Sequence, residues 1–132
     1  MGHRATLLGQ LGILIAATAC GTGGGGGAPD LQRIAALEPP VEHRSGAALF
    51  AARCAACHGK NATGTAGGPP LVHDYYRPSH HGDAAFHLAA QRGVVAHHWR
   101  FGNMPAVPGV TPEDLAAVTG FVRWLQREAG ID

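Results

Sequence analysis

Two long segments of this chain, residues 59–82 and 93–110, are rich in Gly, Pro and His and have no helix or strand pattern. Loops of that length are unusual in a small domain unless something else organises them. The whole domain, loops included, is only about 90 residues, and its few short helical stretches bury little apolar surface by themselves. The sequence therefore predicts an all-α fold whose missing core is supplied by a bound apolar group.

Three main helices are predicted around these loops. The first runs from about Ser45, a typical N-cap residue, to Cys54, with Phe50 on its apolar face. The second covers residues 84–92 and ends at Gly93.

The third helix has the clearest start, because Thr111-Pro112-Glu113-Asp114 provides an N-cap, a proline at the first position and acids in the first turn. It ends at Gly130. Its inward-facing residues at helical spacing are Leu115, Val118, Val122 and Leu125, with Phe121 beside them.

Residues 1–19 have the parts of an export signal: Arg4 in a short positive start, then an apolar stretch too short to span the ~30 Å of a bilayer core. The following Ala17-Thr18-Ala19-Cys20 resembles a bacterial lipobox, although Ala17 stands where Leu is usual. This resemblance implies cleavage before Cys20 and lipid on its thiol and new amino group. An ordinary signal peptide, with Cys20 incidental, is the alternative.

Residues 20–40 are interpreted as the lipid-attachment cysteine and a Gly/Pro-rich tether, and residues 41–132 as the folded domain. Within the tether, residues 30–37 could form a short helix with Asp30 as N-cap, either as a spacer or packed on the domain. Cleavage would remove Arg4 and leave nine basic against nine acidic residues. This balance argues against nucleic-acid binding and against a polybasic membrane patch.

The strongest chemical signal is Cys54-Ala55-Ala56-Cys57-His58, the C-x-x-C-H pattern of haem attachment. Two thiols three residues apart on a helical turn can form thioethers with the two vinyl groups of one porphyrin, and the next residue, His58, then offers an imidazole to the iron. A thioredoxin-like pair lacks its βαβ context here. A zinc site that uses downstream histidines remains the alternative.

Met104 is predicted to be the second axial ligand. It is the only methionine left after loss of residues 1–19, and it precedes Pro105 in a loop that could cross the open haem face. Thioether ligation suits an electron carrier because it raises the reduction potential. The alternatives are an open site or a bis-histidine iron that uses His97 or His98.

The region from about residue 44 to 127 resembles a small class I monohaem cytochrome c. The motifs that carry this resemblance are C-x-x-C-H, Met104-Pro105, Gly46-Ala47-Ala48-Leu49-Phe50 and Gly68-Pro69-Pro70-Leu71. The resemblance implies a cytochrome c-like fold around one covalent haem c, with His58 and Met104 as axial ligands. It also implies a hydrogen bond from His58 to the Pro69 carbonyl, and a last helix that crosses the first near Gly46.

The chain departs from mitochondrial-type members of that family. It has a single lysine, Lys60, so long-range steering of an acidic partner is not expected. The candidate donors to the haem propionates are Tyr75, Tyr76, Arg77, Trp99 and Arg100.

Six histidines are expected near the haem: His73, His80, His81, His87, His97 and His98. They are interpreted as solvated loop residues, with one or two bonded to propionates. A second metal site for copper or zinc, or a pH-dependent docking surface, are the alternatives.

These features predict a monomeric, membrane-tethered carrier of single electrons on the periplasmic side of a bacterial membrane, inner or outer. It would meet redox partner proteins through small transient contacts and would not be an enzyme with a small-molecule substrate. The alternatives are a dedicated haem c subunit of a periplasmic oxidoreductase, or a haem sensor or metal-binding lipoprotein.

Overall fold

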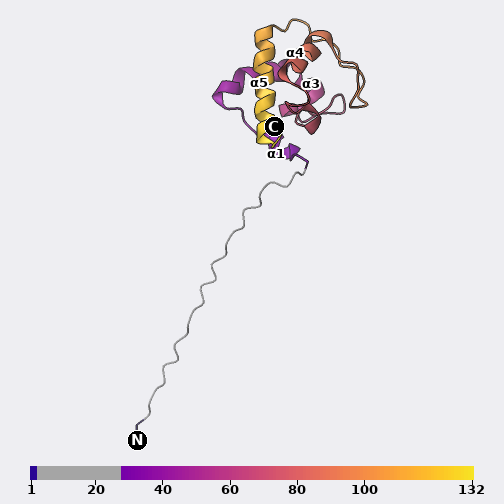
Figure 1. The fold of residues 1–132 in the computed structure, drawn as a ribbon. Coiled ribbons are helices and arrows are strands. Elements are labelled where there is room, and N and C mark those ends of the chain that lie inside the picture. Colours follow the sequence, from indigo (N-terminus) through magenta and orange to yellow (C-terminus); the bar gives the residue numbers. More distant parts are fainter. Residues whose placement is uncertain (3–27) are drawn as a thin grey trace.

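The computed structural model describes residues 1–2 and 28–132 of the chain. The described residues contain no β-strand, only isolated bridges, so the predicted all-α fold is confirmed (Figure 1). Three short 3-10 turns accompany the helices, at Val41–His43, Lys60–Ala62 and Asp74–Tyr76. The helices are α1 (Leu31–Ala36), α2 (Arg44–Arg53), α3 (Ala55–His58), α4 (Asp83–Arg92) and α5 (Pro112–Glu128).

The crossing of α2 and α5 forms much of the core. A Cβ atom at Gly46 would lie 2.1 Å from the Ala117 carbonyl oxygen, so only glycine allows the two helices to approach this closely. Phe50 of α2 and Phe121 of α5 pack beside it, with ring centroids 5.7 Å apart. The expected crossing near Gly46 is confirmed.

The ends of α4 and α5 follow the sequence prediction. In α5, the Asp114 N–H donates to Thr111 Oγ1 at 3.1 Å and the Thr111 N–H donates to the Asp114 carboxylate at 3.0 Å. This capping box satisfies two N–H groups that the first helical turn leaves free. The predicted inward face of α5 is buried, except that Val118 is partly buried. The helix α4 ends at Gly93, whose φ of +76° is readily adopted by glycine.

The start of α2 corrects one expectation. Ser45 is not the N-cap, because the helix begins at Arg44 and Ser45 lies inside its first turn. The preceding 3-10 turn runs directly into α2. The N–H groups of His43 and Arg44 therefore donate to the carbonyls of Pro40 and Val41. These backbone bonds replace a capping side chain.

The short helix α1 packs on the domain and is not a free spacer. Ile34 is fully buried in the core, and Asn61 Nδ2 donates to its carbonyl at 2.9 Å. Figure 1 shows α1 beside the C-terminal end of α5, where Arg33 Nη1 lies 3.9 Å from the Glu128 carboxylate. The packed part of the chain therefore begins before residue 41.

One buried side chain on α5, Arg123, ties the loop before α4 to the core. Its Nε donates to the Asp83 carboxylate at 2.8 Å, and its Nη1 donates to the Tyr76 carbonyl at 2.7 Å. The same Nη1 donates to Gln126 Oε1 at 2.6 Å, and Nη2 donates to the His81 carbonyl. A charge this buried is stabilised only when its N–H groups have partners, as they do here.

Cys20 and residues 3–19 of the predicted signal peptide lie outside the described residues, as does the tether up to residue 27. Among the described residues, no helix combines the length and the apolar character needed to cross a membrane.

Candidate haem-binding site

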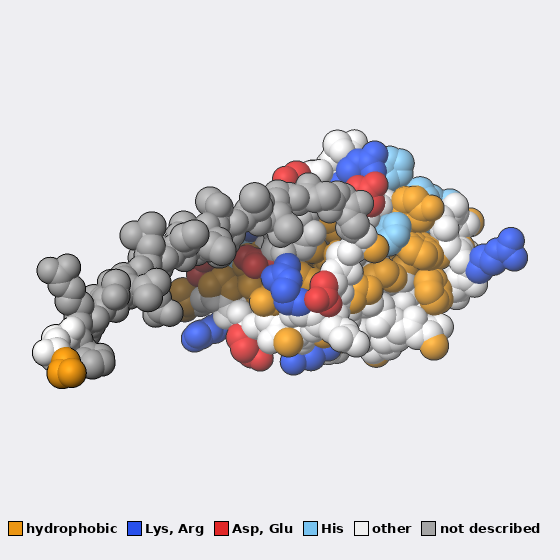
Figure 2. All heavy atoms as spheres, turned by 90° about the horizontal axis from the view of Figure 1, so that it is seen from below, with side chains coloured by type: hydrophobic (Ala, Val, Ile, Leu, Met, Phe, Trp, Pro, Cys, Tyr) orange, Lys and Arg blue, Asp and Glu red, His pale blue; other side chains and the backbone are white. Residues whose placement is uncertain are grey.

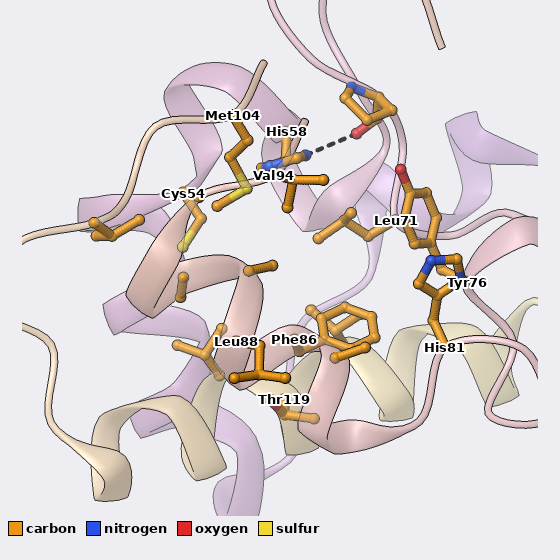
Figure 3. A pocket seen from close by; sticks show the side chains of 18 of the residues that line it. Cys54, His58, Leu71, Tyr76, His81, Phe86, Leu88, Val94, Met104 and Thr119 are labelled. Atoms are coloured by element: carbon orange, nitrogen blue, oxygen red, sulfur yellow. Dashed lines mark hydrogen bonds between the residues drawn. The ribbon is translucent and has the colours of Figure 1, made fainter. Parts of the chain in front are cut away.

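A cavity of about 470 Å³ opens between α4, α5 and the two long loops (Figure 3). Its walls are mainly apolar side chains from α2, α4, α5 and both loops, and its volume is in the range of small-molecule and cofactor sites. Cys54, His58, Pro69 and Met104 all line it. The apolar group that the short helices require therefore has a place in the fold.

His58 is positioned by its own helical turn and by the following loop. It is the last residue of α3 and is buried, with 8% of its surface exposed. Its Nδ1 lies 2.9 Å from the Pro69 carbonyl oxygen, drawn as the dashed line in Figure 3. A carbonyl can only accept, so Nδ1 carries the proton and Nε2 keeps its lone pair. The hydrogen bond expected between these two residues is present.

The electrostatics of His58 favour its neutral form. Burial lowers the pKa of this imidazole below 6.5, and the hydrogen bond to Pro69 opposes that shift only in part. A neutral imidazole with a free Nε2 is the form that binds iron.

The loop that carries Pro69 sits tightly against the C-x-x-C-H turn. A Cβ atom at Gly68 would lie 2.9 Å from the Cys57 carbonyl oxygen, so glycine is required for this approach. Thr65 Oγ1 donates to the same carbonyl at 2.6 Å. The two contacts fix the distance between α3 and the Pro69 carbonyl.

The two cysteines of the motif lie in different surroundings. Cys54 lines the cavity, whereas Cys57 is exposed and is not among the lining residues. Both thiols are free of disulfides. Burial, and to a smaller degree the neighbouring Cys57, raises the pKa of the Cys54 thiol above 9.0.

Met104 reaches the cavity from a loop held by backbone bonds to the end of α4. The Val94 N–H donates to the Met104 carbonyl at 2.9 Å, and the Met104 N–H donates back at 3.0 Å. A Cβ atom at Gly93 would lie 2.5 Å from that same Met104 carbonyl oxygen. Figure 3 places Met104, His58 and Cys54 together at one end of the cavity, with Tyr76 and His81 toward the other.

Only two of the five candidate propionate donors line the cavity, Tyr76 and Trp99. Trp99 Nε1 is buried and has no hydrogen-bond partner among the described residues, which suits a site that receives an acidic group. Burial raises the pKa of the Tyr76 hydroxyl, and the neighbouring Trp99 side chain opposes that shift only in part. Arg77 is instead paired with Asp74 at 2.9 Å, outside the cavity lining.

Some of the predicted histidines line the cavity and others do not. His81, His97 and His98 line the cavity, whereas His87 sits on α4 away from that group. Figure 2 shows histidine side chains near hydrophobic side chains on one face of the molecule. The pKa of the partly buried His98 is lowered, first by lost hydration and then by repulsion from its histidine neighbours.

The residues fit haem in several respects. The cavity is apolar, its lining offers a neutral imidazole, a thiol and a thioether, and the buried indole N–H of Trp99 could donate to a carboxylate. The family model for cytochrome c matches residues 43–126, more than half of the chain. The chain belongs to the cytochrome c family. It is a c-type cytochrome that binds covalent haem c and works in haem-based electron transfer. Comparisons with curated proteins and with solved structures gave no match.

Two features of this cytochrome were not predicted from the sequence. The bridge between Val94 and Met104 joins residues ten apart through a loop with no strand pattern. The second feature is Arg123, a charged residue on the buried side of α5. Thr119, Arg123 and Gln126 are spaced four and three residues apart, so they form a polar stripe along one side of the helix. That polar stripe is the sequence signal that could have indicated a buried arginine.

Proposed function

We propose that this cytochrome is a one-electron carrier with His58 and Met104 as the two axial ligands of its haem iron. The observation that carries the proposal is the shared cavity, which both side chains and Cys54 line. No other methionine lies in the described part of the domain. A saturated iron needs no open site for a substrate, which suits transfer of electrons alone.

The protein's own residues have separate roles in this proposal. Cys54 and Cys57 form the thioethers, with Cys57 reaching the cofactor from the exposed side of the turn. Pro69 fixes the ring orientation and tautomer of His58 through the 2.9 Å hydrogen bond. The Val94 bridge holds Met104 in place, so little rearranges between oxidation states. Bound haem supplies an iron that gains and loses one electron.

The decisive experiment is an optical and carbon monoxide assay of haem-loaded Met104→Leu beside the native protein. Leucine keeps the side-chain volume and removes the sulfur. We expect the reduced native protein to resist carbon monoxide and the reduced variant to bind it readily. Met104→His, which returns a ligand, should resist carbon monoxide again and have a lower reduction potential.

Rapid carbon monoxide binding by the reduced native protein would contradict His/Met ligation. It would indicate an open iron site and favour the haem-sensor alternative. Resistance that persists in Met104→Leu would point to a histidine ligand such as His97 or His98.

We also propose that Cys20 carries a lipid that tethers the domain to the periplasmic side of a bacterial membrane. The support is the segment at residues 17–20 and the glycines that follow. Labelling of growing cells with an alkyne fatty acid should mark the native protein and leave Cys20→Ala unmarked. Equal labelling of the two would contradict the proposal. Fractionation of inner and outer membranes then identifies the membrane.

The partners are proposed to be other redox proteins that dock briefly at the rim of the cavity. Leu88 and Phe101 line that rim and are 44% and 41% exposed. Such a small apolar contact suits a transient encounter by a monomer. A firm complex with one partner on pull-down would instead favour the role of dedicated oxidoreductase subunit.

A further inference from the structure

Three histidine side chains from two separate loops come together at the rim of the cavity. His80 and His81 precede α4, and His98 lies in the loop that follows it. One ring nitrogen from each lies within 4.8 Å of those of the other two, the one such metal-ligand group found among the described residues. Segments 17 residues apart in the sequence therefore present a common set of nitrogen donors.

The backbone beneath two of these residues is well held. The N–H groups of His80 and His81 both donate to the Arg77 carbonyl, at 3.0 and 2.9 Å. The His81 carbonyl accepts from the buried Arg123. A turn fixed in this way loses little further entropy when its side chains gather around an ion.

The ring of His81 is also oriented for ligation. Its Nδ1 lies 2.6 Å from the Tyr75 carbonyl oxygen and must be the protonated nitrogen, which leaves Nε2 with a free lone pair. An imidazole that donates one N–H to a backbone carbonyl while its other nitrogen binds the ion is the common arrangement in metal sites.

His98 supplies an unpartnered donor atom. Its Nε2 is buried and has no hydrogen-bond partner among the described residues. The ring packs 5.1 Å from the ring of His81 and 5.3 Å from that of His80, measured between centroids. A buried polar atom without a partner is costly, and a bound ion would remove that cost.

The donor set decides the class of ion. Three imidazoles without a carboxylate suit Zn²⁺, Cu²⁺ or Ni²⁺ and do not suit Ca²⁺ or Mg²⁺. Zn–N bonds of ~2.0–2.1 Å place tetrahedral ligand nitrogens roughly 3.3 Å apart. The rings therefore need to close by at most about 1.5 Å, and the exposed side chain of His80 has room to move.

We propose that His80, His81 and His98 bind one divalent transition-metal ion, distinct from the haem iron. Water takes the fourth position. The ion cross-links the loop before α4 to the loop that carries Met104, and it stiffens the rim where partners dock.

The test is a Zn²⁺ titration of the haem-loaded protein without a histidine tag, after treatment with a chelator. Isothermal calorimetry should give one saturable site, and hydrogen exchange at residues 77–82 and 96–99 should slow with Zn²⁺. His81→Gln and His98→Gln should each lower the affinity at least about tenfold. His87→Gln, the matched control on α4, should bind like the native protein.

The haem spectrum serves as a second readout: because His81 and His98 also line the haem cavity, Zn²⁺ should perturb the spectrum only slightly and release no haem. Absence of saturable Zn²⁺ binding in the native protein would overturn the proposal. Binding that survives intact in the double variant His80→Gln/His98→Gln would overturn it as well. Circular dichroism of each variant, expected to match the native spectrum, separates loss of ligands from loss of fold.

Discussion

His58 and Met104 reach the same cavity from two parts of the molecule that are built differently. His58 ends a helical turn, is buried, and has a side-chain hydrogen bond to Pro69. Met104 lies in a loop, is only partly buried, and is held through its backbone by Val94. A helical turn and one loop carbonyl therefore position the histidine ring, whereas backbone bonds within a single loop position the methionine.

The difference indicates which side of the site opens first. Segments with few buried contacts and solvent-exposed backbone bonds unfold locally at lower free energy than packed helices. We therefore expect the Met104 side to respond to small changes that leave the His58 side intact. The following experiments test that asymmetry, from the largest expected effect to the smallest.

The double variant Cys54→Ser/Cys57→Ser should lose covalent haem entirely, because no thiol remains in the domain to form a thioether. Acid–acetone extraction should remove all haem from it and none from the native protein. Cys20→Ser is the matched control and should keep its haem. Haem that stays attached in the double variant would disprove the assignment of both cysteines.

Gly93→Ala should disrupt the Met104 side selectively. The added Cβ would lie 2.5 Å from the Met104 carbonyl oxygen, at a φ of +76° that alanine rarely adopts. We expect haem to stay attached through the His58 side while the reduced protein becomes able to bind carbon monoxide.

Gly102→Ala is the control for Gly93→Ala. Its φ of +90° imposes similar backbone strain, but a Cβ there has no neighbour within 4 Å. Resistance to carbon monoxide should persist in this variant. Equal carbon monoxide binding by both would show that strain alone, and not the contact with Met104, is responsible.

Gly68→Ala tests the tight packing on the His58 side. The new Cβ would lie 2.9 Å from the Cys57 carbonyl oxygen, and overpacking of this kind costs about 1–3 kcal/mol. Denaturant unfolding of the haem-loaded protein should show this loss. At Gly67 the nearest atom would be 3.6 Å away, so Gly67→Ala should stay within about 0.5 kcal/mol of the native stability. Equal stabilities for the two variants would argue against the packing interpretation.

The smallest expected effect concerns charge. The cavity lining contains Arg53, Arg92 and Asp114, and the domain has one lysine. Oxidation by ferricyanide and by a cationic cobalt complex should change with ionic strength far less than the ~10–10³-fold of strongly steered reactions. A steep dependence for either reagent would reveal a charged docking edge that the composition does not predict.

Features that depend on neighbouring residues could be predicted from the sequence. The capping box at Thr111, the stop at Gly93 and the turn that precedes His58 are each determined within a few residues. The bond from His58 to Pro69 was also expected, because the resemblance to the cytochrome family places a proline there. All four are present in the structure.

Features that depend on distant contacts could not be predicted. Ile34 is buried because α1 packs on the core and Asn61 donates to the Ile34 carbonyl. The sequence of this short helix, followed by two prolines, does not indicate that contact. Ser45 loses its capping role to a 3-10 turn. The sequence predicts six histidines near the haem, but it does not show that His80, His81 and His98 gather while His87 stays outside that group.

The hydrogen bonds of Arg123 limit which substitutions this domain can accept during evolution. One guanidinium is shared by Asp83, Gln126 and the carbonyls of Tyr76 and His81. Loss of the arginine would leave the His81 carbonyl and the buried Gln126 amide oxygen without this donor, whereas the Tyr76 carbonyl would still accept from Gln126 Nε2. Drift at position 123 should therefore be accompanied by replacement of the buried Gln126, whereas the solvent-exposed Asp83 can lose its partner at little cost.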